Sequence, residues 1–324
     1  MGADPRFGVR LAERMVAVKI AVFGAGGIGG YFGGRLAQAG HDVTFIARGA
    51  HLSALRENGL RVRSVRGDFT VDASATDDPG DVGPCDAVLF CVKSYDTDAA
   101  ASRLPPLLAE GTAVVTLQNG VDNEDKIASV VGRQHVLGGV ALISVALAEP
   151  GTVVDTGGPG QILFGELDGA RTKRVDELLT ACREAGIDAD VPPDIRVVLW
   201  SKFVFICALA GMTAATRRPL GEIRDCPESW EMFGLILREV EAVGRAEGMA
   251  LADDLVEDHL RLTAALEPDM LSSLHHDLAT GHRMELDALH GVVVRLARKH
   301  RIPVPACGAV YALLRPSAIR NEAS

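Results

Sequence analysis

A glycine-rich turn between a short apolar run and a helix-compatible run constrains this chain more than any other feature. Residues 18–23 read VKIAVF, and the next six residues are GAGGIG. A second apolar run, HDVTFIAR, ends at residue 48, so residues 18–48 have the length of one βαβ unit. The sequence therefore predicts an α/β Rossmann-type domain, built on a mainly parallel sheet, at the N-terminal end.

Three glycines of the turn, Gly24, Gly26 and Gly29, match the GxGxxG pattern of dinucleotide-binding proteins. Glycine is required there because the turn is tight and because the pyrophosphate must approach the backbone closely. The N-terminus of the following helix offers N–H groups to the anion. Glycine-rich turns without a nucleotide also exist, but the strand before this turn and the helix after it favour a dinucleotide site.

The end of the second apolar run distinguishes NAD from NADP. An acidic residue there binds the ribose 2′-hydroxyl of NAD, whereas a basic residue accommodates the 2′-phosphate of NADP. This chain has Arg48 at that place, and Asp42 lies too early in the run to reach the ribose. NADPH is therefore the expected cofactor, although an arginine on a solvated surface gives the same pattern.

Two further apolar runs, DAVLFCVKS and TAVVTLQNG, are typical of buried parallel strands, and both end in polar residues. Ligands of open parallel sheets bind outside the carboxyl ends of the strands. This rule places Lys93, Ser94, Gln118 and Asn119 on the cofactor side. The alternatives are helix capping by Ser94 and a simple turn at Asn119-Gly120.

The spacing of apolar residues changes near residue 193. Short β-like runs precede it, including a predicted hairpin over residues 60–75, whereas helical spacing follows Pro193-Asp194. We expect an α/β Rossmann-type N-terminal domain and an all-α C-terminal domain. The expected parts are a flexible extension over residues 1–17, an NADP-binding domain over residues 18–193 and a helical substrate domain over residues 194–324.

Composition argues against several kinds of partner and location. A net charge of −10 leaves no basic surplus for nucleic acid or an anionic membrane. The six cysteines form no CxxC pair and the first 17 residues lack a signal peptide's apolar segment, so a cytoplasmic protein is expected. The 14 apolar or small residues between Lys202 and Arg217 are fewer than the about 20 that span a bilayer, and they predict a buried helix.

A single lysine interrupts the most apolar part of the chain. Lys202 lies in VVLWSKFVFICALAGM, which holds no other charged residue. Burial of an ammonium is costly unless the group is paired or loses its proton, and it moves the pKa toward neutrality, as a general acid requires. The alternative is a side chain that extends from the helix to the surface. Beside a dinucleotide, Lys202 is expected to protonate the alkoxide formed when a carbonyl carbon accepts hydride.

Partners for this lysine are expected in the polar segment LSSLHHDLATGHRMELDALHG. Ser272 or Ser273 can bind a substrate carboxylate, and Glu285 can accept a hydrogen bond from a substrate hydroxyl or from the lysine. Glu285 and Asp287 can equally face solvent. The histidines of the segment match no metal-ligand signature, so no metal is expected.

Together these segments resemble the ketopantoate reductase (2-dehydropantoate 2-reductase) family along almost the whole chain after residue 17. The matching pieces are KIAVFGAGGIGGYFGGRLAQAGHDVTFIAR, CVKSYDT, LQNGVDN, LGGVALISV, LWSK, SSLHHDL and GHRMELDALHG. The resemblance implies NADPH-dependent reduction of a 2-keto acid in a cleft between a Rossmann domain and an all-helical domain. Ketopantoate, the precursor of pantoate in pantothenate biosynthesis, is the first candidate substrate.

The resemblance also implies which residues bind the cofactor. Gly24, Gly26 and Gly29 would hold the pyrophosphate, and Arg48 with Lys93 would meet the 2′-phosphate. A further residue, Asn119, would lie beside the nicotinamide and the substrate.

In the helical domain the resemblance makes Lys202 the general acid, and Ser273 and Glu285 the residues that hold the substrate carboxylate and hydroxyl. The family often has asparagines four and eight residues after this lysine, where this chain has Ile206 and Ala210. Apolar side chains there suit a less hydroxylated or bulkier acid, so reduction of a different 2-keto acid is one alternative. A non-catalytic NADP-binding regulatory protein is another. The helices can also form a homodimer.

Overall fold

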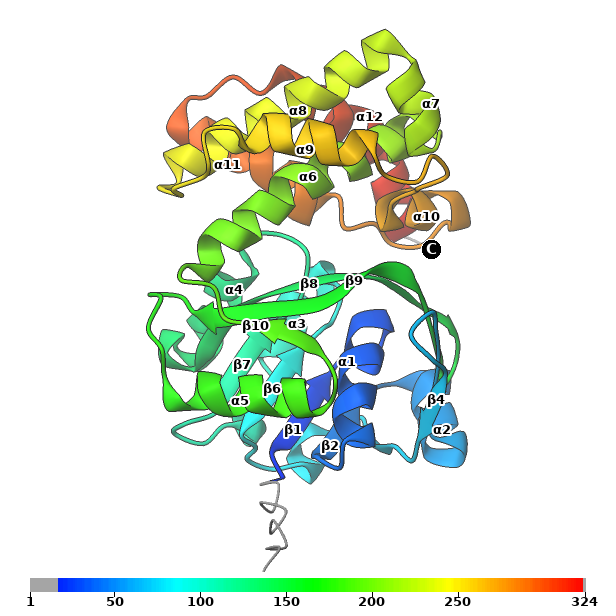
Figure 1. Ribbon diagram of the computed structural model, residues 1–324, viewed down its shortest axis with the longest axis vertical. Helices are drawn as coiled ribbons and strands as arrows, with labels where there is room; N and C mark the ends of the chain where they lie inside the picture. Colours follow the sequence, from blue (N-terminus) through cyan, green and yellow to red (C-terminus); the bar gives the residue numbers. More distant parts are fainter. Residues whose placement is uncertain (1–16, 323–324) are drawn as a thin grey trace, which may run out of the picture.

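The computed structural model describes residues 17–322, in which a curved sheet flanked by helices is joined to a second domain made of helices (Figure 1). The expected flexible extension lies almost entirely outside the described residues. The last strand ends at Asp190 and the first helix of the second domain begins at Ile195. The predicted fold class, an α/β Rossmann-type domain followed by an all-α domain, is confirmed.

Within residues 17–322 the sheet has ten strands, in the order β4-β3-β9-β8-β7-β6-β1-β2-β5, with β10 against β9. Strands β1, β2, β5, β6 and β7 pair in parallel, whereas β8 and β9 form an antiparallel pair. The predicted hairpin is confirmed as β3 and β4. The strands are β1 (Lys19–Phe23), β2 (Asp42–Ile46), β3 (Leu60–Ser64), β4 (Phe69–Val71), β5 (Ser74–Thr76), β6 (Ala87–Phe90), β7 (Ala113–Thr116), β8 (Val136–Glu149), β9 (Thr152–Glu166) and β10 (Asp188–Asp190).

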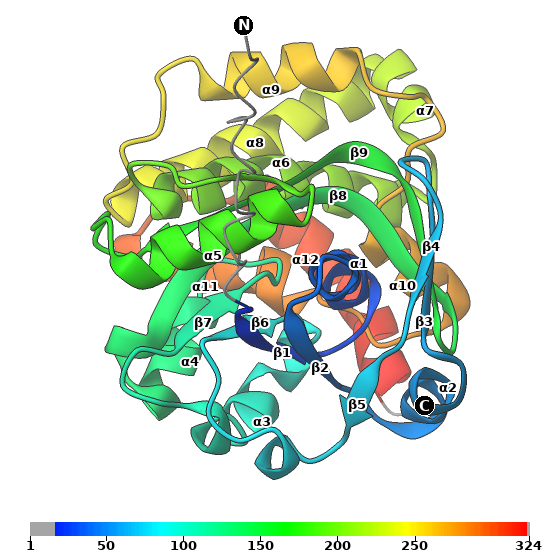
Figure 2. The ribbon, with the colours of Figure 1, turned by 60° about the horizontal axis from the view of Figure 1, so that its bottom comes forward.

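Helices cover both faces of the parallel part of the sheet, which explains its continuous apolar runs. All residues of β6 and β7 are buried. One face packs against α1 (Gly27–Gln38) and α5 (Lys173–Glu184), and the other against α3 (Thr97–Ala101) and α4 (Asn123–Val131). Helix α2 (Gly49–Asn58) follows β2. Figure 2 shows the long strands β8 and β9 passing over α1, toward the helical domain.

The chain changes direction across the sheet at β1, whose neighbours are β2 on one side and β6 on the other. In open α/β sheets a ligand binds at such a switch point, outside the carboxyl ends of the strands. The loops after β1 and β6 meet there, since a Cβ on Gly24 would lie 2.8 Å from the backbone N of Val92. The fold therefore places the glycine turn where a cofactor site is expected.

The helical domain is organised around α6 (Ile195–Thr216), which packs against α8, α10, α12 and α7. Asp194 begins α6, because its side chain accepts hydrogen bonds from the backbone N–H groups of Arg196 and Val197. The other helices are α7 (Leu220–Asp225), α8 (Pro227–Ala246), α9 (Leu255–Ala264), α10 (Ser273–Thr280), α11 (Val292–His300) and α12 (Pro305–Glu322), with a π-helical turn at Asp287–Gly291.

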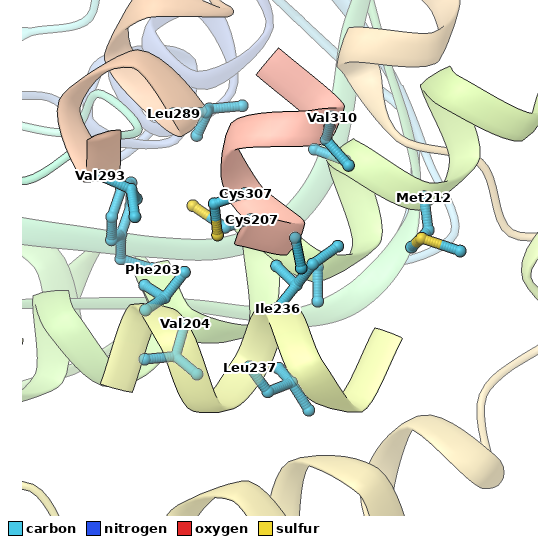
Figure 3. Packing of buried hydrophobic residues seen from close by; sticks show 14 of the residues in the cluster. Phe203, Val204, Cys207, Met212, Ile236, Leu237, Leu289, Val293, Cys307 and Val310 are labelled. Atoms are coloured by element: carbon cyan, nitrogen blue, oxygen red, sulfur yellow. The ribbon is translucent and has the colours of Figure 1, made fainter. Parts of the chain in front are cut away.

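Helix α6 is a core helix, as its composition predicted. Among the described helices it alone is long and apolar enough to cross a membrane, but 67% of its most apolar window is buried inside the protein. Figure 3 shows Phe203, Val204 and Cys207 of α6 packed among side chains of α8 and α12. At its first turns, Ile195 and Leu199 pack on Val140 of β8 and join the domains.

We expect Gly211→Ala to destabilise the helical domain by about 1–3 kcal/mol, because the added methyl overpacks a close contact between α6 and the π-helical turn. A Cβ on Gly211 would lie 2.7 Å from Cε1 of the buried His290 ring. Urea unfolding measures the effect.

The matched control is Gly308→Ala in α12, where an added Cβ meets nothing within 4 Å. Alanine there should stabilise the protein by about 0.5–1 kcal/mol, because it restores helix propensity without a clash. Equal effects of the two substitutions would contradict the packing of α6 described above.

Candidate active site

Glycine suits each of the three positions of the turn for a different structural reason. Gly24 has φ +96°, a conformation that favours glycine, and it turns the chain out of β1. Gly26 is the N-cap of α1, and a Cβ there would meet nothing within 4 Å, so this backbone faces open space. A Cβ on Gly29 would overlap the carbonyl oxygen of Gly24 and lie 2.8 Å from Cγ1 of Val22. The turn fits a dinucleotide pyrophosphate, which needs a tight turn, an open backbone and close helix–strand packing.

Arg48 lies at the N-cap of α2, two residues after the end of β2, and its side chain is 85% exposed. Its guanidinium is 2.6 Å from the carboxylate of Asp96, and Arg283 of the helical domain approaches the same carboxylate at 3.7 Å. The guanidinium of Arg283 also lies 4.2 Å from the ring centre of Tyr95. Two arginines therefore flank the exposed edge of the site. The sequence reasoning missed Arg283, although it stands in the quoted segment GHRMELDALHG.

Lys93, at the carboxyl end of β6, reaches across to the helical domain. Its ammonium lies 3.3 Å from a carboxylate oxygen of Asp277 and 3.3 Å from one of Glu285. Burial lowers the pKa of Lys93, but Glu285 and Asp277 outweigh burial and raise it above its ordinary value. Lys93 therefore stays charged and links the domains, whereas the sequence suggested only a role toward the 2′-phosphate.

Glu285 is buried at 8% exposure, so the solvent-facing alternative does not hold. Its second oxygen accepts a 2.8 Å hydrogen bond from the backbone N–H of Ser94. The neighbouring Asp287 instead bonds Tyr311 and Arg315 within the helical domain. The sequence reasoning missed Asp277, because a second acid in a polar helical segment has no local signal of its partner.

Lys202 and Asn119 meet between the domains. The lysine ammonium donates a 3.1 Å hydrogen bond to Oδ1 of Asn119, in the loop after β7. Burial lowers the pKa of Lys202 to about 8, against a smaller opposing effect of the Glu285 carboxylate. The side chain of Asn123 bonds the backbone carbonyl of Asn119 and steadies this loop. Lys202 thus points toward the Rossmann domain, with an ammonium that can exchange its proton near neutral pH.

The two serines before α10 differ in their contacts. The hydroxyl of Ser272 accepts from the backbone N–H of His275, so Ser272 caps the helix, and it lies 2.7 Å from the Thr213 hydroxyl of α6. Ser273 is the first residue of α10 and is exposed. In the Rossmann domain the Ser94 hydroxyl is buried without a hydrogen-bond partner. Sequence alone did not separate these environments.

An open glycine turn at the switch point, with a half-buried lysine–asparagine pair across the domain boundary, defines a two-domain dinucleotide-dependent oxidoreductase. A family model described as ketopantoate reductase PanE/ApbA matches residues 20–169, and the model of its C-terminal domain matches residues 194–318. The chain belongs to the ketopantoate reductase family.

Individual relatives are similar over almost their whole length. A 2-dehydropantoate 2-reductase of Halobacterium salinarum is 34% identical, covering 92% of this chain and 98% of its own. The oxidoreductase YkpB of Bacillus subtilis is 30% identical with the same coverage. The crystal structure of a PanE/ApbA family ketopantoate reductase from Ralstonia eutropha superposes with a TM-score of 0.86 at 36% identity, covering 94% of this chain and 99% of that one.

We expect Gly26→Ala to weaken NADPH binding by at least about tenfold while the free energy of unfolding changes by less than about 0.5 kcal/mol. The added methyl would fill the space that the pyrophosphate needs and would touch no protein atom. Titration of NADPH fluorescence and urea unfolding give the two quantities.

The comparison variant is Gly29→Ala, which should lower the free energy of unfolding by about 1–3 kcal/mol through its overlap with the backbone of Gly24. Unchanged NADPH binding by Gly26→Ala would show that no dinucleotide approaches this backbone.

Proposed function

We propose that this protein reduces a 2-keto acid with NADPH and that Lys202 is the general acid. The observation that carries the proposal is the 3.1 Å contact of the Lys202 ammonium with Asn119. Asn119 follows β7, at the same edge of the parallel sheet as the glycine turn that follows β1. Relatives such as the Halobacterium salinarum protein bear the name 2-dehydropantoate 2-reductase, which makes ketopantoate the first substrate to test.

Each side chain has a separate task in the proposed reaction. The bound cofactor supplies a hydride to the keto carbon. The ammonium of Lys202 stabilises the negative charge that develops on the keto oxygen and transfers a proton to it. Asn119 holds the ammonium in position, and its contact limits the cost of burying that charge. The Lys93–Glu285 contact keeps the two domains in register around the substrate.

The preference for NADPH rests on Arg48. No acidic residue follows β2 before α2, so the usual acceptor for a ribose 2′-hydroxyl is missing from that position. The exposed guanidinium of Arg48, with Arg283 nearby at the shared Asp96, supplies positive charge suited to a 2′-phosphate.

We expect Lys202→Met to lower kcat with ketopantoate by roughly 10²–10⁴-fold, the usual contribution of a positioned proton donor. Methionine approximates the length of the side chain without the charge, and removal of a buried charge should not lower the free energy of unfolding. Oxidation of NADPH, followed by its absorbance, gives the rate, and fluorescence titration should show unchanged NADPH affinity.

Lys173→Met is the matched control, because Lys173 is exposed and pairs with Glu177 on the surface of α5. It should retain full activity. Normal turnover by Lys202→Met would remove Lys202 from the mechanism, and a preference for NADH over NADPH would refute the assignment of Arg48.

The pH dependence of kcat/KM should follow the ionisation of Lys202. Burial lowers the pKa of Lys202 to about 8, so the proton donor is present below this pH and is lost as the pH rises through it. We therefore expect kcat/KM, which reports the ionisations of the free enzyme, to fall above about pH 8. The residual activity of Lys202→Met should lack this inflection. A level profile far above pH 8 in the unmodified enzyme would contradict proton donation by Lys202.

A further inference from the structure

The face of α6 that continues from Lys202 is apolar wherever it remains accessible. Residues three and four apart share a helix face, so Ile206, Leu209 and Thr213 follow Lys202 along one side of α6. Ile206 and Leu209 keep partial exposure, although most of α6 is buried. This face leads from the Lys202–Asn119 contact to the start of α10, where Thr213 meets Ser272.

The polar groups at the far end of this face already have partners. The Thr213 hydroxyl donates to the backbone carbonyl of Leu209, and Ser272 accepts from His275. Phe205, on the adjacent side of α6, stacks on the ring of His259 at 5.9 Å. Between Lys202 and Thr213, α6 therefore offers a substrate no side-chain hydrogen-bond donor or acceptor.

Ile206 and Leu209 form the accessible apolar wall of α6. These residues differ in part from Ile206 and Ala210, which the sequence suggested. Ala210 is only 3% exposed and belongs to the core of the helical domain, whereas Leu209 keeps an exposed part. Glu285, the carboxylate that acts on the Lys202 pKa, already accepts from Ser94 and Lys93 through its two oxygens. A hydroxyl on the substrate would have to compete with these donors.

We propose that the substrate is a branched aliphatic 2-keto acid whose side chain carries no hydroxyl and packs on Ile206 and Leu209. This inference rests on the proposed function. The reaction is unchanged: hydride from NADPH reaches the keto carbon and a proton from Lys202 reaches the oxygen, which gives a 2-hydroxy acid and NADP⁺. The inference specifies only the side chain of the substrate, next to the keto carbon. An apolar wall favours burial of an aliphatic side chain over burial of one that carries a hydroxyl.

Ketopantoate and trimethylpyruvate test this inference sharply, because the two acids differ only by one hydroxyl. A site that hydrogen-bonds a substrate hydroxyl rejects the analogue without it by about 10⁴–10⁵-fold, whereas an apolar site discriminates against an added hydroxyl by about 10²-fold at most. We expect kcat/KM with NADPH to be about 10- to 100-fold higher for trimethylpyruvate. A ratio near one, or a preference for ketopantoate, would overturn the inference and leave the proposed function standing.

Variants of Ile206 test whether the apolar wall causes the preference for trimethylpyruvate. Ile206→Asn should shift the ratio toward ketopantoate by about tenfold or more, and Ile206→Val, which keeps an apolar surface, should preserve the preference for trimethylpyruvate. The matched control is Leu313→Asn on α12, where leucine is 71% exposed, and its ratio should equal that of the unmodified enzyme. An unchanged ratio in a folded Ile206→Asn enzyme would remove Ile206 from the substrate wall.

A binding measurement separates recognition from turnover. Lys202→Met with bound NADPH retains the wall, so calorimetry should give a lower Kd for trimethylpyruvate than for ketopantoate. Tighter binding of ketopantoate would overturn the inference. If the unmodified enzyme binds NADPH but reduces neither acid nor other 2-keto acids, the proposed function itself fails, an outcome distinct from a reversed preference.

Discussion

The rest of this structure depends on one constraint, the burial of the Lys202 ammonium beside an apolar core helix. Lys202 lies in the core helix of one domain, and its partner oxygen belongs to Asn119 of the other. A buried charge without a partner is costly, so this contact favours the arrangement in which the domains face each other across the site. The same burial lowers the pKa of the lysine to about 8. A charge that costs stability can therefore serve as a proton donor.

A second charged group stabilises the same arrangement. Lys93 lies between the carboxylates of Asp277 and Glu285, and the backbone of Ser94 also bonds Glu285. These contacts join the end of β6 to the segment around α10, while Ile195 and Leu199 join α6 to β8 by apolar packing. The site thus has polar contacts at its centre and an apolar junction at the first turns of α6.

Several features could be predicted because they depend on neighbours in the sequence. The glycine turn follows from a six-residue pattern between a strand and a helix, and the core helix follows from its apolar composition. The exposed wall of α6 was predicted less well, since Ala210 is buried and Leu209 is accessible. Spacing along a helix gives a face, but the helices packed around it decide which edge of that face stays open.

By itself the sequence determined the class of fold, the dinucleotide turn and an unusual lysine, since each is written in local spacing and composition. Only the tertiary structure decided what these residues meet. Lys202 and Asn119 are 83 positions apart, and Lys93 and Glu285 are 192 apart. Local pattern carries no information on such pairs, because the chain has many polar residues that could be the partner. Folding decides which of them lies within hydrogen-bond distance of a buried group.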